Sequence, residues 1–305
     1  MKTFFLGVDV GGTKTNVGLV SPRGKLIRKE KTATRAKSEP RIIISTLCAA
    51  IDRVWTPEVV AIGVGIAGLV DHQKGMFVHG PNFSPNFRNV QLAHVLEKKY
   101  QRPVTVDNDA HCFIVGEHAH GAGREYENIV GMTIGTGVGG GIIINGALYR
   151  GNNNGAGEIG HTTLLESSEK CSCGGIGHLE AAASGSAMIK MFLRETGRSI
   201  DVPGIEKLVE AQDDIAKKIV ERARHALAAG IANVIHTLNP EAIILGGGMI
   251  RFSYFMNRLT REIQDNLTFA ALKLTPVMRG DLGDSANILG AARLARDLAK
   301  RMKKA

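Results

Sequence analysis

The sequence predicts an α/β protein built from two halves with the same plan. Residues 3–10 form an apolar run rich in β-branched and aromatic side chains, a Gly-Gly turn follows, and residues 16–20 form a second apolar run. This order is typical of a β-hairpin. Residues 128–134, 135–141 and 142–144 repeat the order of strand, glycine turn and strand. The repeat indicates a duplicated fold, and we expect a ligand to bind between the halves.

Strands and helices alternate through the rest of the chain. Apolar runs predict further strands at 25–32, 59–64, 104–106 and 241–245. Helical periodicity predicts helices at about 41–55, 90–100, 107–120, 206–238 and 287–304. Either Asn108 or Asp109 has the chemistry of an N-cap for the third of these helices. A β-rich opening followed by alternation suits mixed sheets covered by helices.

Length and composition exclude several classes of protein. The chain has 305 residues, enough for two domains with cores of their own, and 44% of them are apolar. The formal charge of +9 is spread along the chain, and aromatic residues make up only 5%. Single-stranded nucleic acids need aromatic stacking platforms. We therefore expect no nucleic-acid partner, and a solvated basic surface instead.

The sequence carries no sign of secretion or of a membrane. The apolar start at residues 4–6 is too short for a signal peptide, and Asp9 interrupts it. The longest apolar run, residues 59–70, is too short to cross a bilayer. Only four cysteines are present, which makes a disulfide framework improbable. We expect a cytoplasmic protein with no membrane partner.

The turn after the first strand carries groups that suit a metal-bound polyphosphate. Glycines let backbone N–H groups approach an anion, while Thr13 and Lys14 add a donor and a positive charge. Asp9 tolerates a phosphate only across a cation, which indicates Mg²⁺. A plain structural hairpin is the alternative, and a Walker A loop is excluded because a strand follows. The candidate nucleotide-binding residues of this turn are Asp9, Gly11, Gly12, Thr13 and Lys14.

The second half offers a similar glycine turn. Residues 135–140 and 63–68 both match the dinucleotide fingerprint Gly-x-Gly-x-x-Gly, but neither opens a clear helix, so no nicotinamide cofactor is expected. Residues 135–141 instead suit a second phosphate-binding hairpin. Residues 246–248 end a strand, where a flat ligand such as adenosine can meet the backbone. The candidates of this half are Thr136, Gly137, Gly247 and Gly248.

Two cysteines and two histidines form a metal-like cluster. Their pattern is His161-x9-Cys171-x-Cys173-x4-His178, with glycines that supply tight turns. Two thiolates and two imidazoles suit a closed tetrahedral Zn²⁺ site. The alternative is a pair of free thiols beside unrelated histidines. We expect these four residues to bind a structural Zn²⁺.

Asp109 is the carboxylate that we single out as a general base. An aspartate at a helix start is usually only a cap. Here it is accompanied by the two phosphate-type turns and by Glu158 and Glu180, acids that accept hydrogen bonds from a polyol. Three histidines of the same helix are expected to be surface or satisfied side chains rather than ligands, namely His111, His118 and His120.

Taken together, these motifs resemble those of the ROK sugar kinases. They occur in the family's order and cover nearly the whole chain, and their combination is highly specific. The motifs are Asp9-Val-Gly-Gly-Thr-Lys14, Asn108-Asp109-Ala, Gly135-Thr-Gly-Val-Gly-Gly140, Gly157-Glu-Ile-Gly-His161, Cys171-x-Cys-Gly-Gly-Ile-Gly-His-Leu-Glu180 and Leu245-Gly-Gly-Gly248. The family's zinc segment ends in cysteine where this chain has His178, and imidazole is also a sound zinc ligand.

The resemblance implies the actin-like ATPase (ribonuclease H-like) fold, with two duplicated domains and a cleft between them. We expect a smaller N-terminal domain of residues 1–107 and 288–305, and a larger domain of residues 108–287 that carries the zinc-binding loop. By the resemblance Asp109 is the base. The implied sugar-binding residues are Gly68, Asn82, Asn108, Asp109, Glu158, His161 and Glu180.

The implied activity is phosphorylation of the 6-hydroxyl of a hexose by ATP, with Mg²⁺ and a structural Zn²⁺. Asp109 would accept the hydroxyl proton while the oxygen attacks the γ-phosphate in line. We expect glucose first, N-acetylglucosamine or N-acetylmannosamine second and fructose third. The resemblance also implies a homodimer or homotetramer.

Two rival functions remain at this point. One is a sugar-responsive transcriptional repressor of the same family. Those proteins carry an N-terminal helix-turn-helix, which we do not expect here because the first strand begins by Thr3. The other is a non-catalytic binder of sugar or nucleotide, which the presence of both Asp9 and Asp109 disfavours.

Overall fold

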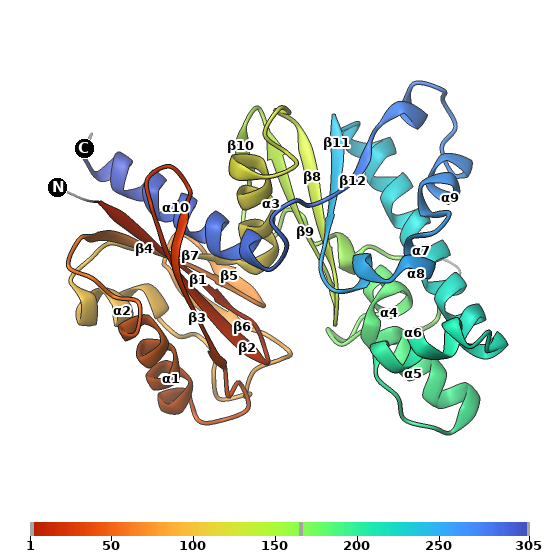
Figure 1. Cartoon of the computed structure of the whole chain (residues 1–305), viewed down its shortest axis with the longest axis horizontal. Helices are drawn as coiled ribbons and strands as arrows, with labels where there is room; N and C mark the ends of the chain where they lie inside the picture. Colours follow the sequence, from red (N-terminus) through yellow and green to blue (C-terminus); the bar gives the residue numbers. More distant parts are fainter. Residues whose placement is uncertain (1–2, 165–166, 304–305) are drawn as a thin grey trace. The chain divides into compact units, whose positions relative to one another are not determined.

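A computed structural model describes residues 3–164 and 167–303, and it has the expected α/β architecture (Figure 1). The first sheet contains β1 (Phe4–Val10), β2 (Lys14–Val20), β3 (Leu26–Ala33), β4 (Val59–Ile66) and β7 (Val104–Asn108). The second contains β8 (Ile129–Ile134), β9 (Val138–Ile144), β10 (Ala147–Tyr149), β11 (Ala242–Gly246) and β12 (Val277–Arg279). A separate hairpin consists of β5 (Leu69–Asp71) and β6 (Met76–His79).

The two large sheets have the same topology. Their strand orders are β3-β2-β1-β4-β7 and β10-β9-β8-β11-β12. In the first, β1 is antiparallel to β2 and parallel to β4, which is parallel to β7. In the second, β9 is antiparallel to β10, and β11 is parallel to both β8 and β12. The matching orders confirm the duplication that the two glycine-turn hairpins predict.

The chain divides into two compact units. Unit 1 comprises Met1–Glu127, Gly141–Ala156 and Gly280–Ala305, and unit 2 comprises Asn128–Gly140 and Gly157–Arg279. Unit 1 therefore contains residues 108–127, 141–156 and 280–287, which the sequence-based boundaries place in the second domain. The reason is local packing, since the helix that follows residue 108 packs along the C-terminal helix. Residues 1–2 and 304–305, which the expected ranges include, lie outside the described residues.

Four longer helices belong to unit 1, namely α1 (Pro40–Asp52), α2 (Leu92–Tyr100), α3 (Asp109–His120) and α10 (Ala286–Met302). Unit 2 holds α4 (Leu179–Ala183), α5 (Gly185–Thr196), α6 (Val202–Glu210), α7 (Asp214–Leu238), α8 (Ser253–Met256) and α9 (Leu259–Asp265). Helix α7 is the centre of unit 2, because α4, α5, α6, α8 and α9 all pack against it.

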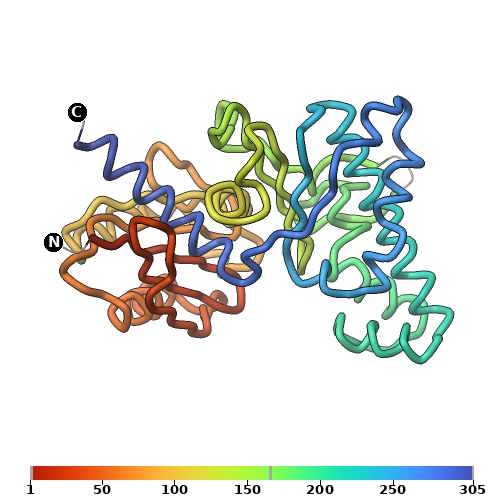
Figure 2. Tube along the Cα trace, turned by 45° about the horizontal axis from the view of Figure 1, so that its top comes forward, coloured from red at the N-terminus to blue at the C-terminus, as the bar shows by residue number. Residues whose placement is uncertain are grey.

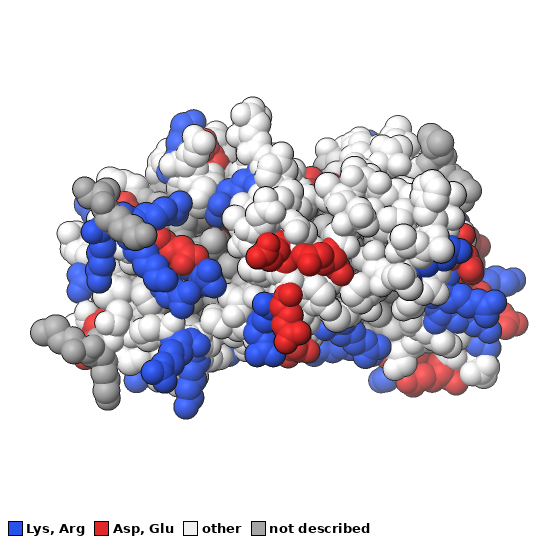
Figure 3. Space-filling model, turned by 90° about the horizontal axis from the view of Figure 1, so that it is seen from above, with Lys and Arg blue, Asp and Glu red and all other residues white. Residues whose placement is uncertain are grey.

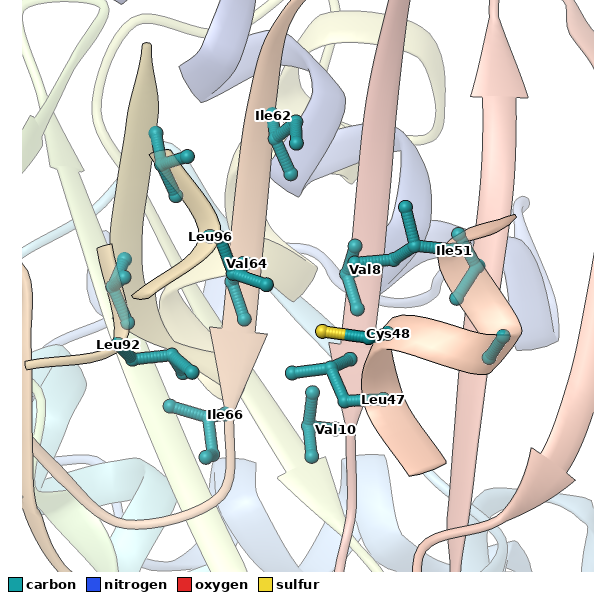
Figure 4. Close-up of a cluster of buried hydrophobic side chains, with 14 of the residues drawn as sticks. Val8, Val10, Leu47, Cys48, Ile51, Ile62, Val64, Ile66, Leu92 and Leu96 are labelled. Atoms are coloured by element: carbon teal, nitrogen blue, oxygen red, sulfur yellow. The ribbon is translucent and has the colours of Figure 1, made fainter. Parts of the chain in front are cut away.

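Helices α1 and α2 supply the core on one face of the first sheet. Strand β1 alternates along its length, and Val8 and Val10 point toward this face (Figure 4). They meet Leu47 and Ile51 of α1, while β4 and α2 continue the same apolar layer. Burial of these side chains is the main stabilising contribution to this layer, at about 25 cal/mol for each Å² of apolar surface removed from water.

The other face of the sheet is covered by α10, which lies beside α3 (Figure 2). Glycines allow this approach. A methyl group on Gly7 of β1 would lie 1.9 Å from the carbonyl oxygen of Ile288, and one on Gly63 of β4 would lie 1.9 Å from that of Ala291. The backbone of α10 therefore packs directly on the strands at these two glycines, while side chains such as Phe5, Ile288 and Ala292 fill the rest of the interface.

Two expectations about element boundaries are wrong. The helix predicted over 206–238 is interrupted, since α6 ends at Glu210 and α7 begins at Asp214. Between them Gln212 adopts a left-handed φ of 66°, and Asp213 caps α7 by accepting a hydrogen bond from Ala216 N at 2.8 Å. The glycine turn predicted over 135–141 is shorter, because β9 already begins at Val138.

The distribution of charged side chains on the surface agrees with the dispersed positive charge that the sequence predicts. On the face drawn in Figure 3, lysines and arginines are spread in several groups with acidic side chains among them. Among the residues described, no helix is both long and apolar enough to span a bilayer.

The close contact between α3 and α10 leads to a prediction about the stability of the protein. A methyl group on Gly290 would lie 1.7 Å from the carbonyl oxygen of Cys112. Because this oxygen belongs to the backbone of α3, it cannot move without shifting the helix. We expect Gly290→Ala to lower the free energy of unfolding by more than about 2 kcal/mol. Urea denaturation measures this, with Gly155→Ala as control because its added methyl group meets open space. Equal midpoints for the two variants would contradict the packing.

Candidate functional site

The carboxylate of Asp9 is held by two amides near the end of β1. Asn16 Nδ2 donates to Oδ2 at 3.0 Å, and Asn287 Nδ2 donates to Oδ1 at 3.1 Å. Asn16 is the register partner of Asp9 on β2, and Asn287 lies in the first turn of α10. Burial raises the pKa of the Asp9 carboxyl, although both amides favour its charged form. Its oxygens are thus fixed in direction and can still accept further donors.

The turn after Asp9 is the expected hairpin turn. Gly11 N donates to Lys14 O at 3.0 Å and closes it, and Thr13 O accepts from Thr34 N at 3.0 Å. A Cβ on Gly12 would lie 2.6 Å from the Cβ of Asn82, so this turn and the Asn82 loop are in close contact. Lys14 is exposed at the start of β2. The turn therefore brings a predicted sugar residue, Asn82, next to predicted nucleotide residues.

Asn108 and Asp109 mark the junction from β7 to α3. Asn108 is the N-cap, since its Oδ1 accepts from Ala110 N at 2.8 Å and from His111 N at 3.4 Å. Its Nδ2 donates to Gly68 O at 3.0 Å. Asp109 is the first residue of the helix, where the partial positive charge of the helix N-terminus favours an anion. Asn108 therefore connects the candidate base to Gly68, another predicted sugar residue.

The pKa of Asp109 is raised. Burial is the main cause, and the charge of Asp9 adds to it, so that the pKa lies at about 6. The negative charge of Asp9 thus disfavours the ionisation of Asp109. A carboxylate with a pKa near 6 is ionised at neutral pH and is a better proton acceptor than an ordinary aspartate.

In unit 2, the turn between β8 and β9 carries Thr136 and Gly137. Glu180 of α4 lies against this turn, and its Oε2 accepts from Val138 N at 3.0 Å. A Cβ on Gly137 would lie 2.4 Å from the same oxygen, so any side chain there would displace the Glu180 carboxylate. Gly247, with a φ of 91°, lies against the backbone of Ile134, whereas a Cβ on Gly248 would meet open space. The glycine loops of unit 2 are therefore neighbours along its sheet.

The Cys/His cluster has the dimensions of a zinc site. The four ligand atoms lie within 4.8 Å of one another. The two Nδ1 atoms of His161 and His178 are 3.3 Å apart, Cys173 Sγ is 3.2 Å from His178 Nδ1, and Cys171 Sγ is 3.7 Å from His161 Nδ1. Around a tetrahedral Zn²⁺, two nitrogens lie about 3.3 Å apart and a nitrogen and a sulfur about 3.5 Å apart. The four side chains, His178 included, therefore have distances that fit a Zn²⁺ ion.

The same cluster orients a predicted sugar residue. With Nδ1 of His161 turned toward the thiols, its Nε2 lies 3.7 Å from Oε2 of Glu158. Glu180 is also tied to this loop, since its Oε1 accepts from Ser172 Oγ at 2.9 Å. Glu158, His161 and Glu180 are thus arranged around the metal-like cluster in unit 2. Residues 165–166 of the same loop are outside the described residues.

Sequence reasoning missed the partners of these side chains. Asn16 could have been found, because the hairpin register places it opposite Asp9. Asn287 gives no signal, since it is 278 residues away from Asp9 in sequence. His111, expected to be a surface or satisfied side chain, is buried and bonded through both of its ring nitrogens, so its hydrogen bonds are satisfied.

The raised pKa of Asp109 predicts a pH-dependent change in stability. The folded state binds the proton more tightly than the unfolded state, so stability falls as the pH rises from about 4 to 6. We expect Asp109→Asn to stabilise the protein at pH 7.5 by about 1 to 2 kcal/mol, a range that allows for the partial exposure of the side chain. The gain should vanish below about pH 4.

Denaturant titrations at several pH values measure this difference. Asp265→Asn, on the exposed side of α9, is the control and should leave the curve unchanged. If Asp109→Asn were no more stable than the wild type at pH 7.5, Asp109 would not be electrostatically strained.

Comparison with known proteins places this chain in a family. The ROK family model matches residues 5–298. A glucokinase of Thermotoga maritima is 34% identical, over 97% of this chain and 98% of that protein. Two solved structures share the actin-like fold, as expected from the motifs. They are a ROK hexokinase from Thermus thermophilus (31% identity, TM-score 0.86, 99% and 100% of the two chains) and a ROK glucokinase from Streptomyces griseus in complex with glucose and AMPPNP (29%, 0.85, 96% and 99%). The chain therefore belongs to the ROK family.

Proposed function

We propose that this protein is an ATP-dependent sugar kinase that phosphorylates the 6-hydroxyl of a hexose, with glucose as the preferred sugar. The observation that carries the proposal is the Asp109 carboxylate, fixed at the start of α3 with a pKa raised to about 6. The glucokinases among its relatives support the substrate class. N-acetylglucosamine or N-acetylmannosamine is the second choice of sugar, and fructose the third.

Asp109 acts as the general base. At neutral pH its carboxylate is ionised and accepts the proton of the attacking hydroxyl while the sugar oxygen bonds to the γ-phosphorus and the bond from that phosphorus to the bridging oxygen breaks, which releases ADP. Asn108 caps α3 and so fixes the direction of the first turn that presents Asp109. Phosphoryl transfer depends mainly on positioning and charge stabilisation, so a rigidly held base is the contribution expected of this segment.

We assign Asp9 to the binding of Mg²⁺. Its oxygens, directed by Asn16 and Asn287, would hold Mg²⁺ directly or through a water molecule. When bound, Mg²⁺ neutralises charge on the phosphates of ATP. We assign the glycine turns at residues 11–14, 136–137 and 247–248 to the nucleotide.

The remaining predicted residues are assigned to the sugar and to zinc. Gly68, Asn82 and Asn108 in unit 1, and Glu158, His161 and Glu180 in unit 2, are assigned to sugar hydroxyls. Zn²⁺ has a structural role, since it would fix the loop that carries His161 and Glu180. The donor set His161, Cys171, Cys173 and His178 has the spacing that tetrahedral zinc requires.

The kinase proposal predicts a selective loss of turnover. Asp109→Asn keeps the size and hydrogen-bonding capacity of the side chain but removes the base. We expect kcat for glucose phosphorylation to fall by about 10³-fold or more, with KM for ATP changed less than about threefold. ADP release measures the rates, and ³¹P NMR identifies the phosphate position. Retained turnover in Asp109→Asn would remove this residue from the role of base.

The zinc assignment is tested without an activity assay. We expect about one zinc per chain in wild type and in His178→Cys, and a lower content together with a lower unfolding temperature in His178→Ala. Elemental analysis and thermal unfolding with and without a chelator measure these quantities. Wild-type protein that takes up no zinc when folded in its presence would contradict the assignment.

A further inference from the structure

A buried ionic network lies directly before the candidate base in unit 1. Asp107, at the end of β7, has no exposed surface. Its Oδ2 accepts two hydrogen bonds from Arg150, from Nε at 2.9 Å and Nη2 at 2.8 Å. Its Oδ1 accepts from Asn108 N at 2.9 Å and from Asn154 Nδ2 at 3.3 Å. Asp107 therefore joins the residue before the base to the segment 150–156.

His111 completes this network from the first turn of α3. The side chain is buried, and Nδ1 lies 2.8 Å from Asp107 Oδ1. On the other side of the ring, Nε2 lies 2.9 Å from the carbonyl oxygen of Ala156. A neutral imidazole carries one hydrogen and can donate only once. A carbonyl oxygen can only accept, so Nε2 must carry a hydrogen.

The other ring nitrogen must also carry a hydrogen. If Nδ1 were an acceptor, the proton would have to sit on Asp107. That carboxylate already receives the paired donors of Arg150 and the N–H of Asn108, both of which stabilise its charged form. A buried group with acceptors on two sides is satisfied only as a donor on both. The geometry therefore requires an imidazolium at His111.

From these contacts we propose that His111 is held as an imidazolium between Asp107 and the Ala156 carbonyl, and that it is a positioning residue for Asp109. The role in catalysis rests on the proposed sugar kinase function. His111 is two residues after Asp109 in the same helical turn and is anchored on both sides. Its ring therefore fixes the orientation of that turn against the segment 150–156.

The charges that face His111 are consistent with this state. Burial alone would lower its pKa, but the bonded Asp107 carboxylate outweighs burial and raises the pKa above its usual value, while Arg150 opposes this. His72 also faces this carboxylate, since its Nδ1 lies 3.5 Å from Asp107 Oδ2. The charge of His111 in turn lowers the pKa of Asp109, against the effects of burial and of Asp9. The imidazolium thus also helps to keep the base ionised.

The raised pKa of His111 determines how the stability of the protein depends on pH. The stability that the His111 pair contributes is fully present below the unfolded-state pKa of about 6.5. It is lost as the pH rises through the higher folded-state value. The stability difference between wild type and His111→Asn should therefore be largest near pH 6 and shrink in alkaline solution.

The protonation state is tested on the wild-type protein by ¹⁵N NMR of the histidine side chains. At pH 7.5 we expect both ring nitrogens of His111 to show protonated shifts. His118 on the same helix is the internal control, because burial lowers its pKa and, among the residues that the structure describes, only its Nε2 meets an acceptor, at 3.1 Å. A neutral His111 ring at this pH would overturn the proposal.

The positioning role is tested with His111→Asn, and His118→Asn is the matched control. In His111→Asn we expect the Asp109 carboxyl to titrate about 0.5 pH unit higher by ¹³C NMR. We also expect kcat to fall at least about tenfold with KM for ATP changed less than about twofold. An unchanged Asp109 titration, or an unchanged kcat in an active protein, would overturn the role. If wild type phosphorylates no sugar, the proposed function fails, while the two NMR measurements still decide the inference.

Discussion

The close contact between α10 and the first sheet is the constraint on which the candidate site depends. Without side chains at Gly7 and Gly63, the helix backbone reaches the strands, and its first turn brings Asn287 to the carboxylate of Asp9. The same helix packs along α3 through Gly290, and so supports the helix that starts with Asp109. Glycines that allow close packing therefore also determine the positions of Asp9 and Asp109.

Neighbouring acids in this unit have opposite electrostatic environments. Asp107 is surrounded by Arg150 and His111, which hold its pKa below the usual range despite burial. Asp109 is buried near another carboxylate, which raises its pKa to about 6. Such a separation of pKa values between adjacent groups is typical of sites where one acid anchors and the other transfers protons. The unfavourable burial of Asp109 lowers stability, as is common for reactive groups.

The sequence predicted well what depends on short stretches of chain. The hairpin of β1 and β2, the capping role of Asn108 and the grouping of the four zinc-type ligands all arise within about twenty residues, where spacing limits the geometry. Contacts between distant segments were not predictable. Asn287 reaches Asp9, and Arg150 reaches Asp107, only because the fold brings their segments together. The break between α6 and α7 was missed because apolar periodicity continues across it.

The most direct test of this account is the pKa of the Asp109 carboxyl, measured by ¹³C NMR in wild type and in Asp9→Asn. The account predicts a value of about 6 in wild type and a lower value in the variant, since one of the two causes of the increase is removed. A wild-type value near the ordinary 3.8, unchanged in Asp9→Asn, would contradict the pairing of the two carboxylates and the tuned base that follows from it.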